Sequence, residues 1–204
     1  MLTVLWIAVA FVFGSFPFSY WLGHLFLHKD IRDYGDGAPG ATNVARAGSK
    51  SLYVIACLMD AFKGAAAIWL ATAFSNIGGW ELVAVAISPV LGHAFTPFLR
   101  FRGGMGVATT YGVWLALAGL IGPIALGACM GLMFIIQKNW VWASIGGMLG
   151  FLIFLLATQL QLPYFPVVCA GHTGILVAKR YTYLKSWPEL QPWLHRISGG
   201  NRDH

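Results

Sequence analysis

Two glycine-rich stretches hold most of the residues in this chain that could bind a charged substrate. The first is KDIRDYGDGAPGATNVARAG, residues 29–48. Its glycines let the backbone approach a ligand closely, and Thr42 or Asn43 can cap a following helix, whose N-terminus favours anions. Its arginines are forked donors that suit phosphate. The residues that predict a phosphate site here are Arg32, Gly35, Gly37, Gly40, Thr42, Asn43 and Arg46.

A second stretch, SPVLGHAFTPFLRFRGGMGVATTYG (residues 88–112), repeats the combination of cations, a glycine turn and a helix start. Two such loops in one chain make coincidence a poor explanation. His93 lies beside the second loop, where it could act as a general base that takes a proton from a substrate hydroxyl; otherwise a substrate phosphate takes it. The alternative for His93 is a packed, hydrogen-bonded histidine at a helix end. The loop residues predicted to bind substrate are Arg102, Gly103, Gly104 and Gly106.

Asp60 and Lys63 are two charged residues within an apolar run. They are three positions apart, so on a helix they share a face and can form an ion pair. Charges inside a membrane are costly and usually face the protein interior or a wet cavity. Two interpretations therefore stand: a structural ion pair, or a site role in which Lys63 helps to bind substrate.

The elements that must position these residues are membrane helices. Of the 204 residues, 58% are hydrophobic and 10% are charged, whereas a soluble domain carries roughly 25% charged residues. A bilayer core takes about 20 apolar residues per helix, and lipid forces backbone polar groups to be satisfied internally. The predicted fold class is all-α, a polytopic integral membrane helical bundle. The candidate spans are residues 2–27, 52–74, 80–98, 107–136, 140–158 and 162–178.

The distribution of basic residues predicts the topology. Lys and Arg favour cytoplasmic loops, which accounts for the net charge of +6 without a nucleic-acid partner. Six spans would place the basic tail on the opposite side from the two basic loops. The conflict disappears if residues 107–136 cross twice, with a break at GLIGP (119–123), because Pro disrupts a helix interior and Gly weakens one. The prediction is about seven transmembrane helices, N-terminus out and C-terminus in; a re-entrant pair would satisfy the charges equally well.

The predicted organisation is one transmembrane domain, residues 1–180, and a basic interfacial or cytoplasmic tail, residues 181–204. The tail contains Trp and Tyr, which favour the depth of the membrane interface. The alternative for the first glycine-rich loop is a flexible connection that needs no ligand and whose basic residues only follow the positive-inside rule. No metal site is expected, because the three cysteines lie in separate apolar runs without metal-ligand spacing. They are Cys57, Cys129 and Cys169.

Four segments of the chain resemble the bacterial membrane acyl-phosphate:glycerol-3-phosphate acyltransferases, the PlsY family. They are GSFPFSYWLG, DIRDYGDGAPGATNVARAG, DAFKG and PVLGHAFTPFLRFRGGMGVAT. The resemblance implies transfer of a fatty acyl group from acyl phosphate to glycerol 3-phosphate, giving lysophosphatidate, with no metal or other cofactor. It implies a multi-pass protein of the bacterial plasma membrane with its site facing the cytoplasm. The implied partners are the two substrates, membrane lipid and the soluble enzyme that forms acyl phosphate.

The same resemblance assigns residue roles. His93 and Arg46 match positions expected to be catalytic. The positions expected to bind substrate are Arg32, Gly35, Gly37, Gly40, Thr42, Asn43, Lys63, Arg102, Gly103, Gly104 and Gly106. If Arg46, Arg102 and His93 serve one reaction, they should lie around one cleft on one membrane face.

The chain also departs from the family pattern. It has Asp36, Gly37 and Ala38 where the family usually reads Ser-Gly-Asn, and Met105 where it usually has Lys. Arg180 and Tyr183 stand in the places of the third motif's His and Asn. Asp36 would repel a phosphate unless Arg32 or Arg46 neutralises it, so Asp36→Ser and Met105→Lys are expected to tighten phosphate binding. The alternative to an active acyltransferase is a degenerate paralogue that binds lipid or phosphate without turnover. A transporter fits less well, because few polar residues line the spans.

Overall fold

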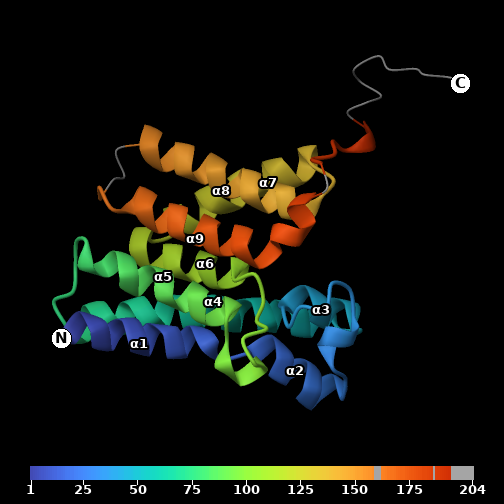
Figure 1. Cartoon of the computed structure of the whole chain (residues 1–204), viewed down its shortest axis with the longest axis horizontal. Coiled ribbons are helices and arrows are strands. Elements are labelled where there is room, and N and C mark those ends of the chain that lie inside the picture. Colours follow the sequence, from blue (N-terminus) through green and yellow to red (C-terminus); the bar gives the residue numbers. More distant parts are fainter. Residues whose placement is uncertain (159–161, 186, 194–204) are drawn as a thin grey trace, which may run out of the picture.

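The computed structural model describes residues 1–158, 162–185 and 187–193. Within these ranges the chain is helical, with short connections and one isolated β-bridge (Figure 1). The predicted all-α class is confirmed. The helices are α1 (Leu2–Ser15), α2 (Phe18–Leu27), α3 (Ala41–Arg46), α4 (Lys50–Phe74), α5 (Glu81–Ala94), α6 (Val107–Ala118), α7 (Ile121–Ile136), α8 (Trp140–Ala157) and α9 (Phe165–Arg180). Short 3-10 turns follow α2, α5 and α9, and they are η1 (Ile31–Asp33), η2 (Pro97–Leu99) and η3 (Tyr181–Lys185).

The first apolar run is interrupted, although it was predicted to be a single helix over residues 2–27. Helix α1 ends at Ser15 and α2 begins at Phe18, so the break falls at Phe16 and Pro17. Pro17 has no backbone N–H to donate to the preceding turn, and its ring clashes with it. The two helices together still form one 26-residue segment that is apolar enough to span a membrane.

The predicted break in residues 107–136 is confirmed. Helix α6 ends at Ala118, Gly119 takes a positive φ of 59°, and α7 begins at Ile121. Pro123 lies in the first turn of α7, where a proline is tolerated. Helices α6 and α7 have only 12 and 16 residues, fewer than the about 20 of a full span. The count of seven transmembrane helices and the orientation stay predictions.

Among the described residues, four segments are long and apolar enough to cross a bilayer. They are Leu2–Leu27, Lys50–Phe74, Glu81–Leu99 and Trp140–Ala157. Helix α9, predicted from residue 162 to residue 178, runs from Phe165 to Arg180. These segments make the protein an integral membrane protein with several spans.

Small residues let the helices that carry the charged groups pack closely. A Cβ on Gly92 of α5 would overlap the Phe11 carbonyl of α1, and one on Gly112 of α6 would overlap the Ala61 carbonyl of α4. Close helix approach at small residues is the usual means of packing in membranes. In Figure 1, α1, α4 and α5 lie side by side in the half of the molecule that also holds α2 and α3. Helices α4 and α5 also contact each other directly, and Lys63 of α4 lies next to His93 of α5.

The tail returns to the turn between α7 and α8. Gln137 and Leu190 form the β-bridge, and the Lys138 amide donates to the Glu189 carbonyl at 2.8 Å. Trp187 is largely exposed, as an interfacial residue would be, but the depth of the tail stays a prediction. Its last basic residues, Arg196 and Arg202, lie outside the described residues.

Candidate functional site

The two glycine-rich loops meet at one cavity of about 690 Å³. Gly40, Thr42, Asn43 and Arg46 line it from the first loop and α3. His93, Met105 and Gly106 line it from α5 and the second loop. The first residues of α6 also line it, and a helix N-terminus favours anions. Arg46 and His93 therefore share one cleft as predicted, whereas Arg102 is exposed and does not line it.

The opposite wall of the cavity is apolar. Tyr53, Cys57 and Leu58 come from α4, Tyr111 from α6, and Phe134 from α7. Leu58 and Phe134 also have exposed side chains. The cavity therefore runs from polar loops to a surface that suits hydrocarbon.

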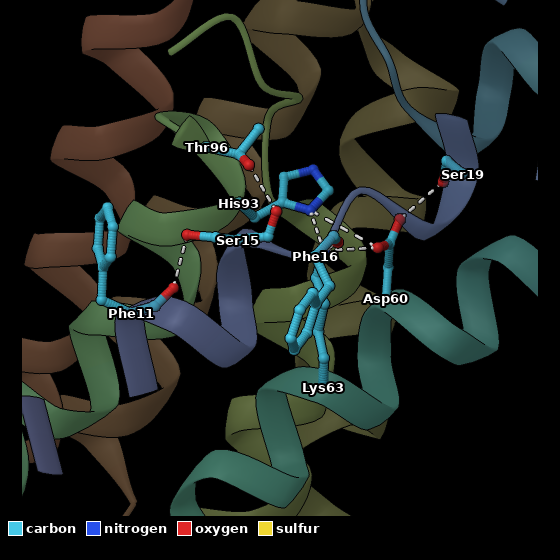
Figure 2. A network of polar contacts seen from close by, with 8 residues as sticks. All are labelled: Phe11, Ser15, Phe16, Ser19, Asp60, Lys63, His93 and Thr96. Atoms are coloured by element: carbon cyan, nitrogen blue, oxygen red, sulfur yellow. Dashed lines mark hydrogen bonds and ion pairs between the residues drawn. The ribbon is translucent and has the colours of Figure 1, made fainter. Parts of the chain in front are cut away.

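A buried charge cluster lies at His93 (Figure 2). Lys63 Nζ is 2.7 Å from Asp60 Oδ1, and each of these side chains is 2% exposed. The Lys63 ammonium also donates to the Phe16 carbonyl at 2.7 Å. It lies 2.9 Å from His93 Nδ1. The Ser19 hydroxyl donates to the other Asp60 oxygen at 2.8 Å. The structure thus places Lys63 in contact with His93, and not in the wall of the large cavity.

The break between α1 and α2 completes this cluster. A carbonyl inside a helix is normally bonded to the amide four residues later, but Phe16 lies between the two helices. Its oxygen accepts from the Lys63 ammonium at 2.7 Å and from the Phe18 amide at 3.1 Å. Ser19, in the first turn of α2, reaches Asp60 from the same side. The ion pair is therefore confirmed, and Asp60 and His93 line the cavity, while the substrate-binding role of Lys63 stays a prediction.

The contact with Lys63 sets the proton position on His93. An ammonium group has three donors and no acceptor, so the His93 nitrogen that faces it must offer a lone pair. A neutral His93 with a free Nδ1 pair carries its proton on Nε2. The Nε2 atom faces Gly104, and the described residues provide it with no hydrogen-bond partner. With Lys63 charged, His93 therefore presents an N–H donor at the second loop, and the general-base role stays a prediction.

The glycines of the second loop make room for His93. A Cβ on Gly104 would overlap His93 Nε2, and one on Gly103 would overlap the His93 carbonyl. Gly106 has a φ of +77°, which L side chains rarely adopt, and it ends the loop where α6 begins. Gly103 and Gly104 therefore bring the loop against α5.

Asp36 and Asn43 organise the first loop. Asp36 Oδ1 accepts from the Asn43 side-chain amide at 2.9 Å and from the Ala38 backbone amide at 3.2 Å. Asn43 Oδ1 in turn accepts from Arg46 Nη1 at 3.1 Å. Gly35, at φ +60°, leaves no space for a Cβ beside Asn43 and Arg46. Gly37 also has a positive φ, of 71°. The loop is thus ordered around the side chain that holds Arg46.

The capping roles predicted for Thr42 and Asn43 are wrong. Gly40 is the N-cap of α3, so both residues lie inside this six-residue helix. The helix that is capped by a side chain is the next one, α4, where the Ser49 hydroxyl accepts from the Leu52 amide at 3.1 Å. Thr42 and Asn43 still line the cavity.

The expected partners of Asp36 are also wrong. Its Oδ2 accepts from Arg180 Nη2 at 2.6 Å, and neither Arg32 nor Arg46 pairs with it in the part of the chain that the structure describes. Arg32 pairs with Asp30 instead, lies over the Tyr20 ring and does not line the cavity. The Arg32 guanidinium holds the pKa of the Asp30 carboxyl below its usual value. Because Asp36 is neutralised, the reason for expecting Asp36→Ser to tighten binding no longer holds.

Arg180 lines the cavity but was identified in the sequence only as a departure from a motif. It reaches Asp36 from the last turn of α9, and its guanidinium lies 5.3 Å from the centre of the Trp140 ring on α8. The signal that could have revealed it is the opposite charge of the two departing positions. The side chain of Tyr183, the other departure in that motif, lies outside the described residues.

The chain is similar to a set of known acyltransferases. The family model described as Glycerol-3-phosphate acyltransferase matches residues 4–186. A curated glycerol-3-phosphate acyltransferase of Bordetella petrii is 45% identical over 112 residues, or 54% of this chain and 53% of that protein. The chain thus spans about half the length of such curated relatives. One from Synechococcus sp. (strain JA-2-3B'a(2-13)) is 34% identical over 170 residues, or 83% of this chain and 84% of that protein.

The fold is similar to the crystal structure of PlsY, an integral membrane glycerol 3-phosphate acyltransferase, in its glycerol 3-phosphate form. The TM-score is 0.77 at 24% identity, and the match covers 99% of this chain and 94% of that one. The lysophosphatidic acid form of PlsY gives a TM-score of 0.75 at 23% identity. At this identity the likeness establishes the fold.

Proposed function

The chain belongs to the glycerol-3-phosphate acyltransferase family, and we propose that it is an active acyltransferase. It transfers a fatty acyl group from acyl phosphate to glycerol 3-phosphate and releases lysophosphatidate and phosphate. The observation that carries this proposal is one cavity that joins two polar loops to an apolar wall. The reaction needs both surfaces, because both substrates carry a phosphate and one carries a hydrocarbon chain.

We propose that the phosphates bind at the polar end of the cavity. Arg46 offers a forked donor there, and the N-terminus of α6 adds backbone amides beside Gly106. The acyl chain follows the apolar wall past Leu58 and Phe134 toward the lipid. This placement puts the acyl carbonyl between the loops, near His93.

The chemical step needs an acceptor for one proton. The hydroxyl oxygen of glycerol 3-phosphate attacks the acyl carbonyl carbon, the bond from this carbon to the phosphate oxygen breaks, and phosphate leaves. Since His93 presents an N–H, we propose that a phosphate oxygen of a substrate takes the hydroxyl proton. His93 Nε2–H instead donates to the oxygen on which negative charge develops.

The location and organisation belong to the same proposal. We place the protein in the bacterial plasma membrane with the cavity at the cytoplasmic face, because basic loops favour that side. Residues 1–180 form the membrane domain and residues 181–204 form a basic tail at the interface. The soluble enzyme that forms acyl phosphate supplies the donor.

The test is an assay of the purified protein with acyl phosphate and glycerol 3-phosphate. We expect lysophosphatidate and inorganic phosphate to appear in equal amounts. Arg46→Ala serves as the matched variant, because it removes a cation that lines the cavity. If the protein binds glycerol 3-phosphate in calorimetry but gives no product, it is a binding protein and the proposal fails.

A further inference from the structure

We propose that Arg180 is a positioning residue of this substrate site, which acts through Asp36 and Asn43 on Arg46. The inference rests on the proposed function, since Arg46 is taken to hold a substrate phosphate. It adds a residue of α9 to a site otherwise formed by the two loops and by α3, α4, α5, α6, α7 and α8.

Three hydrogen bonds connect α9 to Arg46. Arg180 Nη2 donates to Asp36 Oδ2 at 2.6 Å. The Asn43 side-chain amide donates to Asp36 Oδ1 at 2.9 Å, and Arg46 Nη1 donates to Asn43 Oδ1 at 3.1 Å. Each side chain thus limits the rotamers of the next. A change at Arg180 is therefore felt at Arg46 without direct contact between the two arginines.

The pair also controls the charge of the cavity wall. Asp36 lines the cavity into which phosphate groups bind under the proposed function. Its side chain is 15% exposed and that of Arg180 is 11% exposed, so solvent screens the pair weakly. With Arg180 present the two charges cancel. Without it, an uncompensated carboxylate would face an anionic substrate and would also attract Arg46 away from that substrate.

The two positions depart from the family pattern together. The resemblance puts Ser at position 36 and His at position 180, and this chain has an acid and a permanently charged base there. The ion pair explains both changes at once, because neither residue alone would leave the wall neutral. The departures therefore do not indicate a degenerate site.

The test is a double-mutant cycle on glycerol 3-phosphate binding, measured by calorimetry, and on its KM. We expect Arg180→Ala to weaken binding roughly tenfold to a hundredfold, as for the loss of a charged hydrogen bond. Arg180→Lys should weaken binding less than Arg180→Ala does, because lysine keeps the positive charge and loses only the planar fork. In an Asp36→Ser background, Arg180→Ala should cost less than about threefold, because no carboxylate remains to be neutralised. An equal loss in both backgrounds would mean that Arg180 acts independently of Asp36, and the proposal would be overturned.

A second background guards against misfolding. Asp36→Asn removes the charge and keeps an oxygen that accepts from the Asn43 amide. In this background Arg180→Gln should also weaken binding by less than about threefold. Lys138→Ala is the matched control, because it removes an ion pair of 2.9 Å whose side chains are 60% and 62% exposed; it should leave binding unchanged. A loss in thermal midpoint with unchanged affinity would reduce Arg180 to a structural role and overturn the proposal. Because calorimetry measures binding without turnover, an inactive protein would contradict the proposed function alone.

Discussion

The loop of residues 33–48 and the loop of residues 100–106 border the same cavity but use their residues differently. In the first, Asp36, Asn43 and Arg46 bond to one another and line the cavity. In the second, Gly103 and Gly104 pack against His93, and the arginines are exposed away from the cavity.

The difference separates two roles that a glycine-rich, basic loop can have. The first loop provides charge, and an acid, an amide and a distant arginine hold its cation in place. The second loop provides shape, because its glycines allow close contact with α5. His93 of that helix is held by its contact with Lys63. Composition alone does not distinguish them; the neighbours of each side chain do.

The largest effect should come from filling the space beside His93. Gly103→Ala would place a Cβ against the carbonyls of His93 and Ala94, and backbone atoms cannot rotate away. Overpacking of this kind costs about 1–3 kcal/mol of stability, and we expect turnover to fall at least about a hundredfold as His93 is displaced. Gly78→Ala, which meets nothing within 4 Å, is the control. Normal turnover and thermal midpoint in Gly103→Ala would refute the shape role of the second loop.

Removing the cation of the first loop should have the next largest effect. Arg46→Ala should raise the KM for glycerol 3-phosphate or acyl phosphate roughly tenfold to a hundredfold, because a charged hydrogen bond is worth about 1.5–3 kcal/mol. Initial rates at varied concentrations of each substrate measure it. An unchanged KM for both would mean that the first loop does not supply the charge.

A cation introduced into the second loop should give that loop a charged donor to phosphate, as the first loop has. Met105 lines the cavity, so Met105→Lys would add there a charged donor to phosphate. We expect affinity for glycerol 3-phosphate or acyl phosphate to rise by up to about tenfold, and the gain to fade at high salt if the site is wet. Calorimetry at low and high salt measures both effects. Weaker binding would show that position 105 needs an apolar side chain.

The smallest effect should come from Arg102. It is exposed and does not line the cavity, so Arg102→Ala should change KM by less than about twofold, within the range of ordinary surface substitutions. The comparison with Arg46→Ala under identical conditions is decisive. A loss as large as that of Arg46→Ala would restore the sequence-based assignment of Arg102 to the site.

Much of the fold follows from local sequence. The break near Gly119 was predictable, because the charge distribution required it and the Gly and Pro residues located it. The break at Pro17 also arises at a proline, but it was not predicted. Residues 2–27 were assigned from hydropathy and the absence of charges, and neither property depends on a single proline. The meeting of the two loops at one cavity was also predictable, because both follow helix ends on the side that the basic residues mark as cytoplasmic, although Arg102 does not line that cavity.

The contacts that determine the site were not predictable in the same way. Arg180 and Asp36 are 144 positions apart, and the opposite charges of the two residues do not by themselves show that they meet. The hydrogen bond between Lys63 and His93 depends on how α4 packs against α5. Whether the Arg102 side chain reaches the cavity depends on the direction in which its loop turns. Residue type indicated phosphate chemistry, and tertiary packing decided which residues could take part.

The ion pair within α4 has a consequence for the biogenesis of the protein. A charged residue at the bilayer centre costs roughly 2.5–3.5 kcal/mol on insertion scales. Asp60 and Lys63 lie one turn apart, so the nascent helix enters the bilayer with its own counter-ion and waits for no later segment. The Phe16 carbonyl and Ser19 are synthesised earlier and can bind the pair on arrival. When His93 packs against Lys63, the charges of Asp60 and Lys63 already balance each other, whatever the rate at which the remaining helices are made.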